Sequence, residues 1–523
     1  MKVYTSENIR VEYTGTVIYK DRFVGEDSIR GLMSDFQKES IDFSELYGCF
    51  SIAIHNVLDG SVIFFCDNMG YMPIYYTVTG TPIFSRSLID MVERTGKTEK
   101  DLDWNAIFSF LEFGFCYSNL TFFKNIKKCS GDYIYKIENE CIHITQKACK
   151  YKNIENIDDY IKQLKRILSA FKKEKVLFDI TGGTDSRLLV CLAESIGLNY
   201  EFFVRGHSGA VDIKIAKEIA ILLNRPLHVM EAKAFDEFTE EGFLKLCTEL
   251  DGMYMPLEGF QLLEAYKNRQ QIGCTYNIGG LGGEYYKTFW IMRNKKVNSS
   301  YTNAVFLREK LASDHFYCSV KEVYDKYSDS LVTQLDIEDV SKLTTYLNWY
   351  RKHLFPKKSG ILYGLSSKYT PAYPPLAETV FSSWIYSMPM FDRILKIFYR
   401  KIITRECRKL GELPTNTKIS LSLRPLKLCN DLLVSFFRFI KRVNSKIFTG
   451  KMYSTVAERV SADTDESLLR NSTFLHDVYA VLQEKNVLHK NADFSIMSIA
   501  MLERYLVIWF WLKKLQIQEN YAN

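Results

Sequence analysis

Residues 175–193 read Lys175-Val-Leu-Phe-Asp-Ile-Thr-Gly-Gly-Thr-Asp-Ser-Arg-Leu-Leu-Val-Cys-Leu-Ala193, and this stretch decides the fold of the chain. Its apolar run, Val176–Ile180, predicts a buried strand. Beyond it, apolar residues recur at the spacing of one helix face, at Leu188, Leu189, Cys191, Leu192 and Ile196. A strand that turns through two glycines into a helix directs backbone N–H groups at an anion. The stretch therefore predicts a phosphate-binding turn between a buried strand and a helix.

The side chains of this turn indicate which phosphate compound it binds. Thr181 and Ser186 add hydroxyl donors to the backbone N–H groups. Asp185 is an unusual residue for a bare phosphate site, but it fits a Mg²⁺ ion that bridges it to the phosphates of a nucleotide. An ordinary polar turn is the alternative, and the strand and helix on either side argue against it. The predicted binding residues are Thr181, Gly182, Gly183, Thr184, Asp185 and Ser186.

The composition is that of a soluble globular protein. The 523 residues suffice for two or three domains, and 47% are hydrophobic and 25% charged. The net charge of +6 is small for this length and both signs are interspersed, so the sequence predicts neither a nucleic-acid nor a membrane partner. The 12 Cys and 8 His lack the spacing of disulfide or metal motifs, which favours reduced thiols in the cytoplasm.

Three segments were candidates for targeting or membrane contact. The N-terminus has no apolar signal core. Tyr505–Leu512 is strongly apolar but too short to span a bilayer, so it predicts a buried C-terminal helix. Leu426–Phe448 is interrupted by charged residues and predicts an amphipathic helix.

Residues 1–150 are predicted to form a β-rich domain. Short apolar or alternating runs, separated by turn residues, predict strands at 11–19, 48–55, 61–66, 74–78, 132–137 and 142–145. One helix is predicted over Asp103–Phe113, with Asp103 as its N-cap.

Residues 151–523 are predicted to form an α/β domain with a helical C-terminal part. Helices predicted at 157–171 and 211–223 alternate with strands at 176–180, 200–204 and 227–231. This alternation predicts a doubly wound parallel sheet. Ligands of such sheets bind beyond the carboxyl ends of the strands, where the two-glycine turn falls. Beyond about residue 300 the pattern is largely helical.

The turn resembles the S-G-G-x-D-S loop of the PP-loop ATP pyrophosphatases, with Thr181 in place of the first Ser. Those enzymes cleave ATP between its α- and β-phosphates. Three earlier segments resemble the G-x-F-A, D-R-x-G-x-x-P-L-Y-Y and F-A-S-E segments of asparagine-synthetase-type amidotransferases: Tyr47-Gly-Cys-Phe50, Cys66-Asp-Asn-Met-Gly-Tyr-Met-Pro-Ile-Tyr-Tyr76 and Phe84-Ser-Arg-Ser87. The resemblance implies an N-terminal-nucleophile-hydrolase-like domain followed by a PP-loop domain.

A second glycine-rich segment is similar to another loop of that family. Residues 277–284 read Asn-Ile-Gly-Gly-Leu-Gly-Gly-Glu and resemble its S-G-x-G-x-D-E loop. The resemblance implies that Gly280 and Gly282 contribute to nucleotide binding. It also implies that Glu284 replaces an Asp that ligates Mg²⁺. Leu281 stands where relatives carry a Glu or Tyr involved in acceptor chemistry, and a Leu side chain cannot move a proton.

Several other positions have two interpretations each. Lys418 lies near a family Lys that stabilises the adenylate or pyrophosphate, or it is an ordinary exposed Lys. Asp212 is a nucleotide contact or a helix-start carboxylate. Asp251 lines the acceptor site or belongs to a turn. Tyr285, Tyr286 and Lys287 are candidates for proton transfer, but we expect the two tyrosines to pack under the loop.

The resemblance also indicates what the first domain lacks. In the family, a Cys directly after the initiator Met attacks glutamine; here residue 2 is Lys2, and the first Cys is Cys49. Thr14 replaces the Asn of the family's F-N-G-E-I-Y segment, whose amide helps to form the oxyanion hole. That segment also lies nearer the start of the chain than in the family. We therefore expect residues 1–150 to have a structural or docking role and no glutaminase activity.

These features predict an ATP-dependent, AMP-forming amide ligase. A small-molecule carboxylate would attack ATP to give an acyl-adenylate and pyrophosphate, and an amine or ammonia would then displace AMP. Asp185 and Glu284 would hold Mg²⁺, and Glu284 and Lys418 would act in catalysis.

Two alternatives come from other classes of protein. A catalytically inactive protein that binds a nucleotide or a partner is favoured by the changes at Lys2, Thr14 and Leu281. A tRNA-modifying sulfurtransferase is disfavoured, because the sequence has neither a reactive Cys pair nor a basic RNA surface. The sequence does not decide which substrates are used or whether the chain forms a homodimer. It also leaves open whether the product is asparagine, a natural-product amide or a modified glycan.

Overall fold

The computed structural model describes most of the chain, including both glycine-rich segments. The residues outside its description are 7, 117–118, 233–237, 288–350, 352–355, 357–358, 435–436, 438–466, 489–491, 493–496 and 523. Part of the helical region expected beyond residue 300 and most of the helix expected at 426–448 therefore lie outside the described residues.

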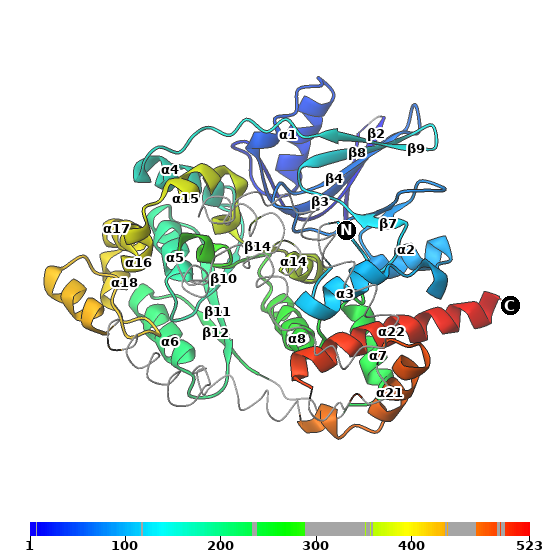
Figure 1. Ribbon diagram of the computed structural model, residues 1–523. Helices are drawn as coiled ribbons and strands as arrows, with labels where there is room; N and C mark the ends of the chain where they lie inside the picture. The colour runs from blue at the N-terminus through cyan, green and yellow to red at the C-terminus, as the bar shows by residue number, and fades with distance from the viewer. Residues whose placement is uncertain are drawn as a thin grey trace.

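The N-terminal part is built on a six-stranded antiparallel sheet with the order β1-β2-β3-β4-β8-β9 (Figure 1). The strands are β1 Lys2–Ser6, β2 Ile9–Tyr19, β3 Leu46–Asn56, β4 Val62–Cys66, β8 Tyr133–Glu138 and β9 Cys141–Gln146. Gly15 on β2 has a φ of 89° and lies so close to β3 that a Cβ would stand 2.1 Å from the Cys49 carbonyl oxygen. The β-rich N-terminal part is thus confirmed, and β1 is a strand that the sequence analysis did not predict.

Smaller elements pack beside this sheet. A three-stranded sheet has the order β6-β5-β7, with β5 Tyr75–Thr77, β6 Phe84–Ser85 and β7 Ile126–Lys128. The helices are α1 Glu26–Phe36, α2 Leu88–Thr95 and α3 Trp104–Phe113, with 3₁₀ turns η1 Phe43–Glu45 and η2 Glu99–Asp101. The Asp103 side chain accepts from the N–H groups of Asn105 and Ala106, which confirms it as the N-cap of α3.

The second part is built on a five-stranded parallel sheet with the order β12-β11-β10-β13-β14. The strands are β10 Val176–Asp179, β11 Tyr200–Gly206, β12 Leu227–Glu231, β13 Tyr276–Ile278 and β14 Ala372–Tyr373. Along the chain, β11 and β12 are added in turn on one side of β10. The next strand, β13, is added on the other side of β10. The sheet therefore has its topological switch point between β10 and β13.

Helices cover both faces of the parallel sheet (Figure 1). They are α5 Asp185–Ser195 and α6 Val211–Leu223 on one face and α8 Pro256–Ile272 on the other. Helix α4 Ile157–Ser169 packs on α5, and α7 Glu240–Glu249 packs on α8. Val176 and Phe178 of β10 share a buried cluster with α5, whereas Leu177 packs on the opposite face against Ala265 of α8. This arrangement confirms the predicted doubly wound α/β fold.

The C-terminal part is helical where it is described. Its helices are α14 Gly360–Ser366, α15 Ser382–Ser387, α16 Met390–Leu395, α17 Ile397–Glu406, α18 Arg408–Glu412, α21 Leu475–Glu484 and α22 Ile499–Ala522. Three 3₁₀ turns lie at η3 Gly283–Tyr286, η6 Pro375–Ala377 and η7 Thr379–Phe381. The apolar stretch Tyr505–Leu512 is buried within α22, as predicted.

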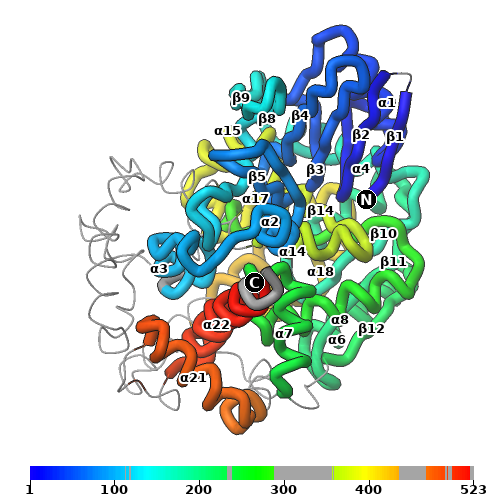
Figure 2. The backbone as a smooth tube through the Cα atoms, turned by 90° about the vertical axis from the view of Figure 1, so that its right-hand side faces the viewer, coloured from blue at the N-terminus to red at the C-terminus, as the bar shows by residue number. Residues whose placement is uncertain are grey.

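Helix α22 joins the two parts of the chain, and both views place it beside α3 and α7 (Figures 1 and 2). The Trp511 indole N–H donates to the Gly252 carbonyl at 2.8 Å, and its ring centroid is 5.1 Å from that of Phe123. One buried cluster extends from Ile18 to Leu515, so residues 1–150 and 151–523 share a core. A domain boundary near residue 150 stays a prediction.

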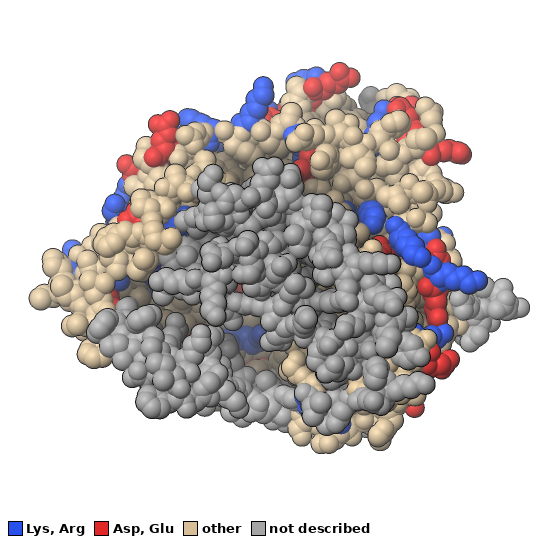
Figure 3. Space-filling model, in the orientation of Figure 1, with Lys and Arg blue, Asp and Glu red and all other residues tan. Residues whose placement is uncertain are grey.

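Within the described residues, no helix has the length and apolar character needed to cross a bilayer. On the face in Figure 3, Lys and Arg alternate with Asp and Glu around the described rim. This distribution agrees with the interspersed charges of the sequence.

Candidate active site

The two-glycine turn lies at the switch point of the parallel sheet. It follows β10 and opens α5, which begins at Asp185 with Thr184 as its N-cap. The second glycine-rich segment, residues 279–282, follows the neighbouring strand β13 and packs on the start of α5. A Cβ on Gly280 would lie 2.9 Å from the Asp185 Cβ and 3.0 Å from the Ser186 nitrogen. The fold therefore brings together the two segments that the sequence singled out.

Hydrogen bonds within the turn set its shape. The Gly183 N–H donates to Thr181 Oγ1 at 3.2 Å, and the Thr181 N–H donates to Ser186 Oγ at 3.5 Å. The Thr184 hydroxyl donates to the Asp185 carboxylate at 3.3 Å. Thr181 is exposed and Asp185 is partly exposed, whereas Ser186 is buried. One side of the turn is thus open to a ligand.

Asp212 on α6 braces the turn from outside. Its Oδ1 accepts from the Gly182 N–H at 2.9 Å and from the Asn416 amide at 3.2 Å. The Asn416 backbone N–H in turn donates to the Gly182 carbonyl at 2.9 Å. A Cβ on Gly182 would lie 2.8 Å from both neighbours, so this position requires glycine. Asp212 therefore positions the turn, and sequence reasoning missed its partner Asn416.

Arg187 holds the segment after α18 against α5. This fully buried side chain donates to the carbonyl oxygens of Leu410 at 3.3 Å, Leu413 at 2.7 Å and Pro414 at 2.6 Å. Burial lowers the pKa of its guanidinium to about 10, which still leaves it charged at neutral pH. The sequence signal for this role was a lone Arg on the apolar helix that follows the turn.

Lys418 belongs to the segment that Arg187 and Asn416 hold beside the turn. It is exposed, its φ is 56°, and its N–H donates to the Thr415 carbonyl at 2.7 Å. Among the described residues, no hydrogen bond or ion pair joins the Lys418 side chain to the turn. Its segment lies beside the turn, and its role in catalysis stays a prediction.

Asp185 is the centre of a compact polar cluster. Its Oδ2 lies 2.5 Å from the Lys287 ammonium, and its Oδ1 accepts from the Tyr399 hydroxyl at 2.6 Å. The same hydroxyl lies 3.1 Å from the Gly283 carbonyl oxygen. A Cβ on Gly283 would stand 2.1 Å from the Asp185 carboxyl carbon, so only glycine allows this approach. Sequence reasoning missed Tyr399, which comes from α17, 214 residues away.

Glu284 lies beside this cluster on η3. Its carboxylate accepts from the Gly282 N–H at 2.8 Å. Burial raises the pKa of the Glu284 carboxyl to about 7, and the negative charge of Asp185 adds to the effect. The positive charge of Lys287 opposes it. Asp185 and Glu284 therefore lie close enough to influence each other.

The two carboxylates suit a Mg²⁺ ion in the type of ligand they offer. Mg²⁺ is usually held by one or two carboxylates together with substrate phosphates and water. No group of three His, Cys, Asp or Glu side chains able to hold a metal occurs among the described residues. A metal between Asp185 and Glu284 would therefore depend on the phosphates of a nucleotide for further ligands, and the assignment stays a prediction.

Leu281 and the two tyrosines that follow it contribute to the packing of the core. Leu281 is partly buried against the main core. Tyr285 and Tyr286 are both buried; the Tyr286 hydroxyl accepts from Tyr160 at 3.0 Å and donates to the Leu376 carbonyl at 3.2 Å. This confirms the expectation that the two tyrosines pack under the loop.

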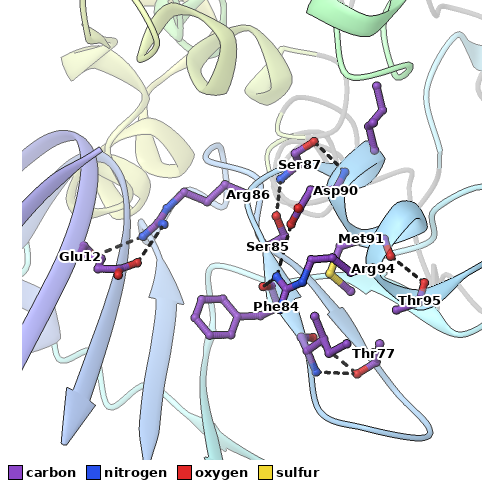
Figure 4. Close-up of polar contacts among 12 residues, drawn as sticks. Glu12, Thr77, Phe84, Ser85, Arg86, Ser87, Asp90, Met91, Arg94 and Thr95 are labelled. Atoms are coloured by element: carbon purple, nitrogen blue, oxygen red, sulfur yellow. Dashed lines mark hydrogen bonds and ion pairs between the residues drawn. The ribbon is translucent and has the colours of Figure 1, made fainter. Parts of the chain in front are cut away.

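The amidotransferase-like segment around β6 serves structural contacts. Arg86 reaches β2, where it donates to the Glu12 carbonyl at 3.2 Å (Figure 4). It also reaches β3, where it donates to Ser51 Oγ at 2.6 Å. Ser87 caps α2 and donates to the buried Asp251 carboxylate at 2.5 Å. Asp251 also accepts from two N–H groups of α2, so it anchors that helix.

The region around Thr14 offers no exposed thiol among the described residues. Cys49 lies on β3 opposite Thr16 and is buried, and burial raises the pKa of its thiol well above the usual value. The Thr14 hydroxyl donates to Ser367 Oγ at 3.5 Å. Cys49 is therefore poorly suited to act as a nucleophile.

One part of the chain is similar to a known protein family. Residues 28–148 match the glutamine amidotransferase domain family. No curated protein matches the chain.

Three of the solved structures that match the chain show how remote these likenesses are. NMN synthetase from Francisella tularensis is 16% identical over 38% of this chain and 94% of that chain, with a TM-score of 0.20. Glutamine phosphoribosylpyrophosphate amidotransferase from B. subtilis, complexed with ADP and GMP, is 10% identical over 45% of this chain and 65% of that chain, with a TM-score of 0.17. The U34-tRNA thiolase NcsA from Methanococcus maripaludis is 14% identical over 54% of this chain and 89% of that chain, with a TM-score of 0.18. These TM-scores are too low to carry an argument.

Proposed function

We propose that this protein is an ATP-dependent, AMP-forming amide ligase without glutaminase activity of its own. The observation that carries the proposal is the two-glycine turn at the switch point of the parallel sheet, with Asp185 at the start of α5. The facing segment, residues 279–284, and the glutamine amidotransferase domain match before it support the same assignment.

In this proposal the chain acts by positioning and charge. The N–H groups at the start of α5 would hold the phosphates, since those of Thr181, Gly182 and Gly183 already donate to Ser186, Asp212 and Thr181. Asp212 and Asn416 keep the turn in shape through their bonds to Gly182. Mg²⁺, held by Asp185 and Glu284, would offset the charge of the departing pyrophosphate. A carboxylate oxygen would attack the α-phosphorus as the bond to pyrophosphate breaks, and an amine or ammonia would then displace AMP.

Product analysis tests this function. The unaltered protein, Mg²⁺-ATP and a panel of carboxylic acids are incubated with ammonium or amines, and AMP and pyrophosphate are measured. Both products should appear in equal amounts with at least one acid, and Asp185→Asn should lower their rate at least tenfold. Asp90→Asn, which changes an exposed ion pair on α2, is the matched control. Absence of AMP with every acid, together with no effect of Asp185→Asn on nucleotide binding, would contradict the proposal.

The nitrogen source gives a second arm of the test. Because Cys49 is buried, we expect ammonium to support amide formation and glutamine to fail. Release of glutamate from glutamine by the purified protein would contradict this part of the proposal.

A nucleotide-binding protein without catalysis is the second candidate. Leu281 favours it, because that side chain cannot exchange a proton with an acceptor. Such a protein would bind Mg²⁺-ATP in a manner sensitive to Asp185→Asn and yet release no AMP with any acid and amine.

A further inference from the structure

The ion pair between Lys287 and Asp185 joins two functional segments. The Lys287 ammonium lies 2.5 Å from Asp185 Oδ2, and the two side chains are 25% and 20% exposed. Lys287 directly follows η3, and Asp185 opens α5. The other oxygen of Asp185 accepts from Tyr399. Both oxygens of the predicted Mg²⁺ ligand are thus already engaged by side chains of this chain.

A lysine in this position competes with a divalent cation. An ammonium on Asp185 Oδ2 and a metal ion bound to the same oxygen would repel each other at short range. Lysine has a flexible stem and three donors, and it binds phosphate as a point charge. The partial exposure of Lys287 leaves its ammonium room to move from the carboxylate to a neighbouring anion. The open side of the two-glycine turn is where such an anion would lie.

We infer that Lys287 is the internal cation of this site: without a nucleotide it neutralises Asp185 and keeps a divalent metal off that carboxylate, and when a nucleotide binds it pairs with the polyphosphate and leaves Asp185 to Mg²⁺. The inference rests on the proposed function and names a binding residue beyond it. The resemblance to the S-G-x-G-x-D-E loop ends before Lys287, so no family motif assigns this role.

The inference predicts two effects of opposite sign for Lys287→Met. Without nucleotide, the variant should bind Mn²⁺ more tightly than the unaltered protein, by at least threefold in an electron paramagnetic resonance titration. In EDTA, it should bind ATP about tenfold to hundredfold more weakly, as expected for loss of a charge-assisted hydrogen bond. In excess Mg²⁺ the loss should be smaller, because the metal then supplies the positive charge.

Lys485→Met is the matched control. Lys485 forms an ion pair with Glu99 at 2.8 Å, and the two side chains are 26% and 24% exposed. This substitution should leave both affinities unchanged. Lys287→Arg keeps the charge and should retain measurable ATP binding in EDTA.

A purely structural role would give a different pattern. If the ion pair only stabilised the fold, Lys287→Met would lower the affinities for Mn²⁺ and ATP together, and that result would overturn the inference. ATP binding by the unaltered protein that disappears completely in EDTA would also overturn it, even if Lys287→Met failed to fold. Absence of ATP binding both with and without Mg²⁺ would instead overturn the proposed function.

Discussion

Glu378 is a buried carboxyl group between the two halves of the chain. Its Oε1 accepts from the Gly48 N–H at 2.7 Å and from the Tyr373 hydroxyl at 2.9 Å. Burial raises the pKa of this carboxyl from 4.5 to about 8. At pH 7 the group is therefore mostly protonated in the folded protein and ionised in the unfolded chain.

The pH dependence follows from this difference in protonation. Between pH 5 and pH 8 the folded state retains a proton that the unfolded state has lost, so the free energy of unfolding falls as pH rises. The slope is about 1.4 kcal/mol per pH unit, which gives roughly 4 kcal/mol over this window. Glu378→Gln removes this contribution, because an amide does not titrate and its oxygen can accept both hydrogen bonds. The variant should match the unaltered protein near pH 5 and exceed its stability near pH 8.

Thermal unfolding of both proteins at pH 5.0 and pH 8.0 measures the effect. For a chain of this length, roughly 4 kcal/mol corresponds to a difference in Tm of about 4 °C. Glu378→Ala is the control, because it removes the acceptor for Gly48 and Tyr373 and should lower Tm at both pH values. The reasoning would be refuted if the difference in Tm between Glu378→Gln and the unaltered protein were no larger at the higher pH than at the lower one.

Three further predictions concern the site and its surroundings. Gly283→Ala should lower the affinity for Mg²⁺-ATP at least tenfold in titration calorimetry, because its Cβ would stand 2.1 Å from the Asp185 carboxyl carbon; unchanged affinity would contradict the packing. Arg187→Met should lower the free energy of unfolding by about 2–4 kcal/mol in urea, since three carbonyl oxygens lose the donor of a buried side chain. Alkylation of Cys407 should have a midpoint near pH 6, because the hydrogen bond with Cys191 lowers its pKa to about 6; Cys191→Ala should raise that midpoint.

The strand, turn and helix at residues 175–193 could be predicted because their signals are local. The buried run of β10, the paired glycines and the apolar face of α5 lie within twenty residues of one another. The N-cap of α3 was predictable for the same reason. Helix α1 was missed, because Ser28 and Gly31 are among its buried residues and weaken its apolar stripe.

The residues that shape the site could not be found this way. Asp212 and Asn416, which both bond to Gly182, are 204 residues apart in sequence. Tyr399 reaches Asp185 from a helix whose pattern indicates only amphipathic packing. Such contacts form only when the sheet and the C-terminal helices pack together. The spacing of residues within one sequence does not indicate how these distant elements pack. The resemblance supplied the neighbourhood of Lys418 but not its contacts.

The central claim is that the turn at Thr181–Ser186 supports cleavage of ATP between its α- and β-phosphates. Exchange of labelled pyrophosphate into ATP, measured with Mg²⁺ and a panel of carboxylic acids, tests it most directly. The account predicts acid-dependent exchange that Asp185→Asn abolishes. Formation of ADP and inorganic phosphate in place of exchange would contradict it.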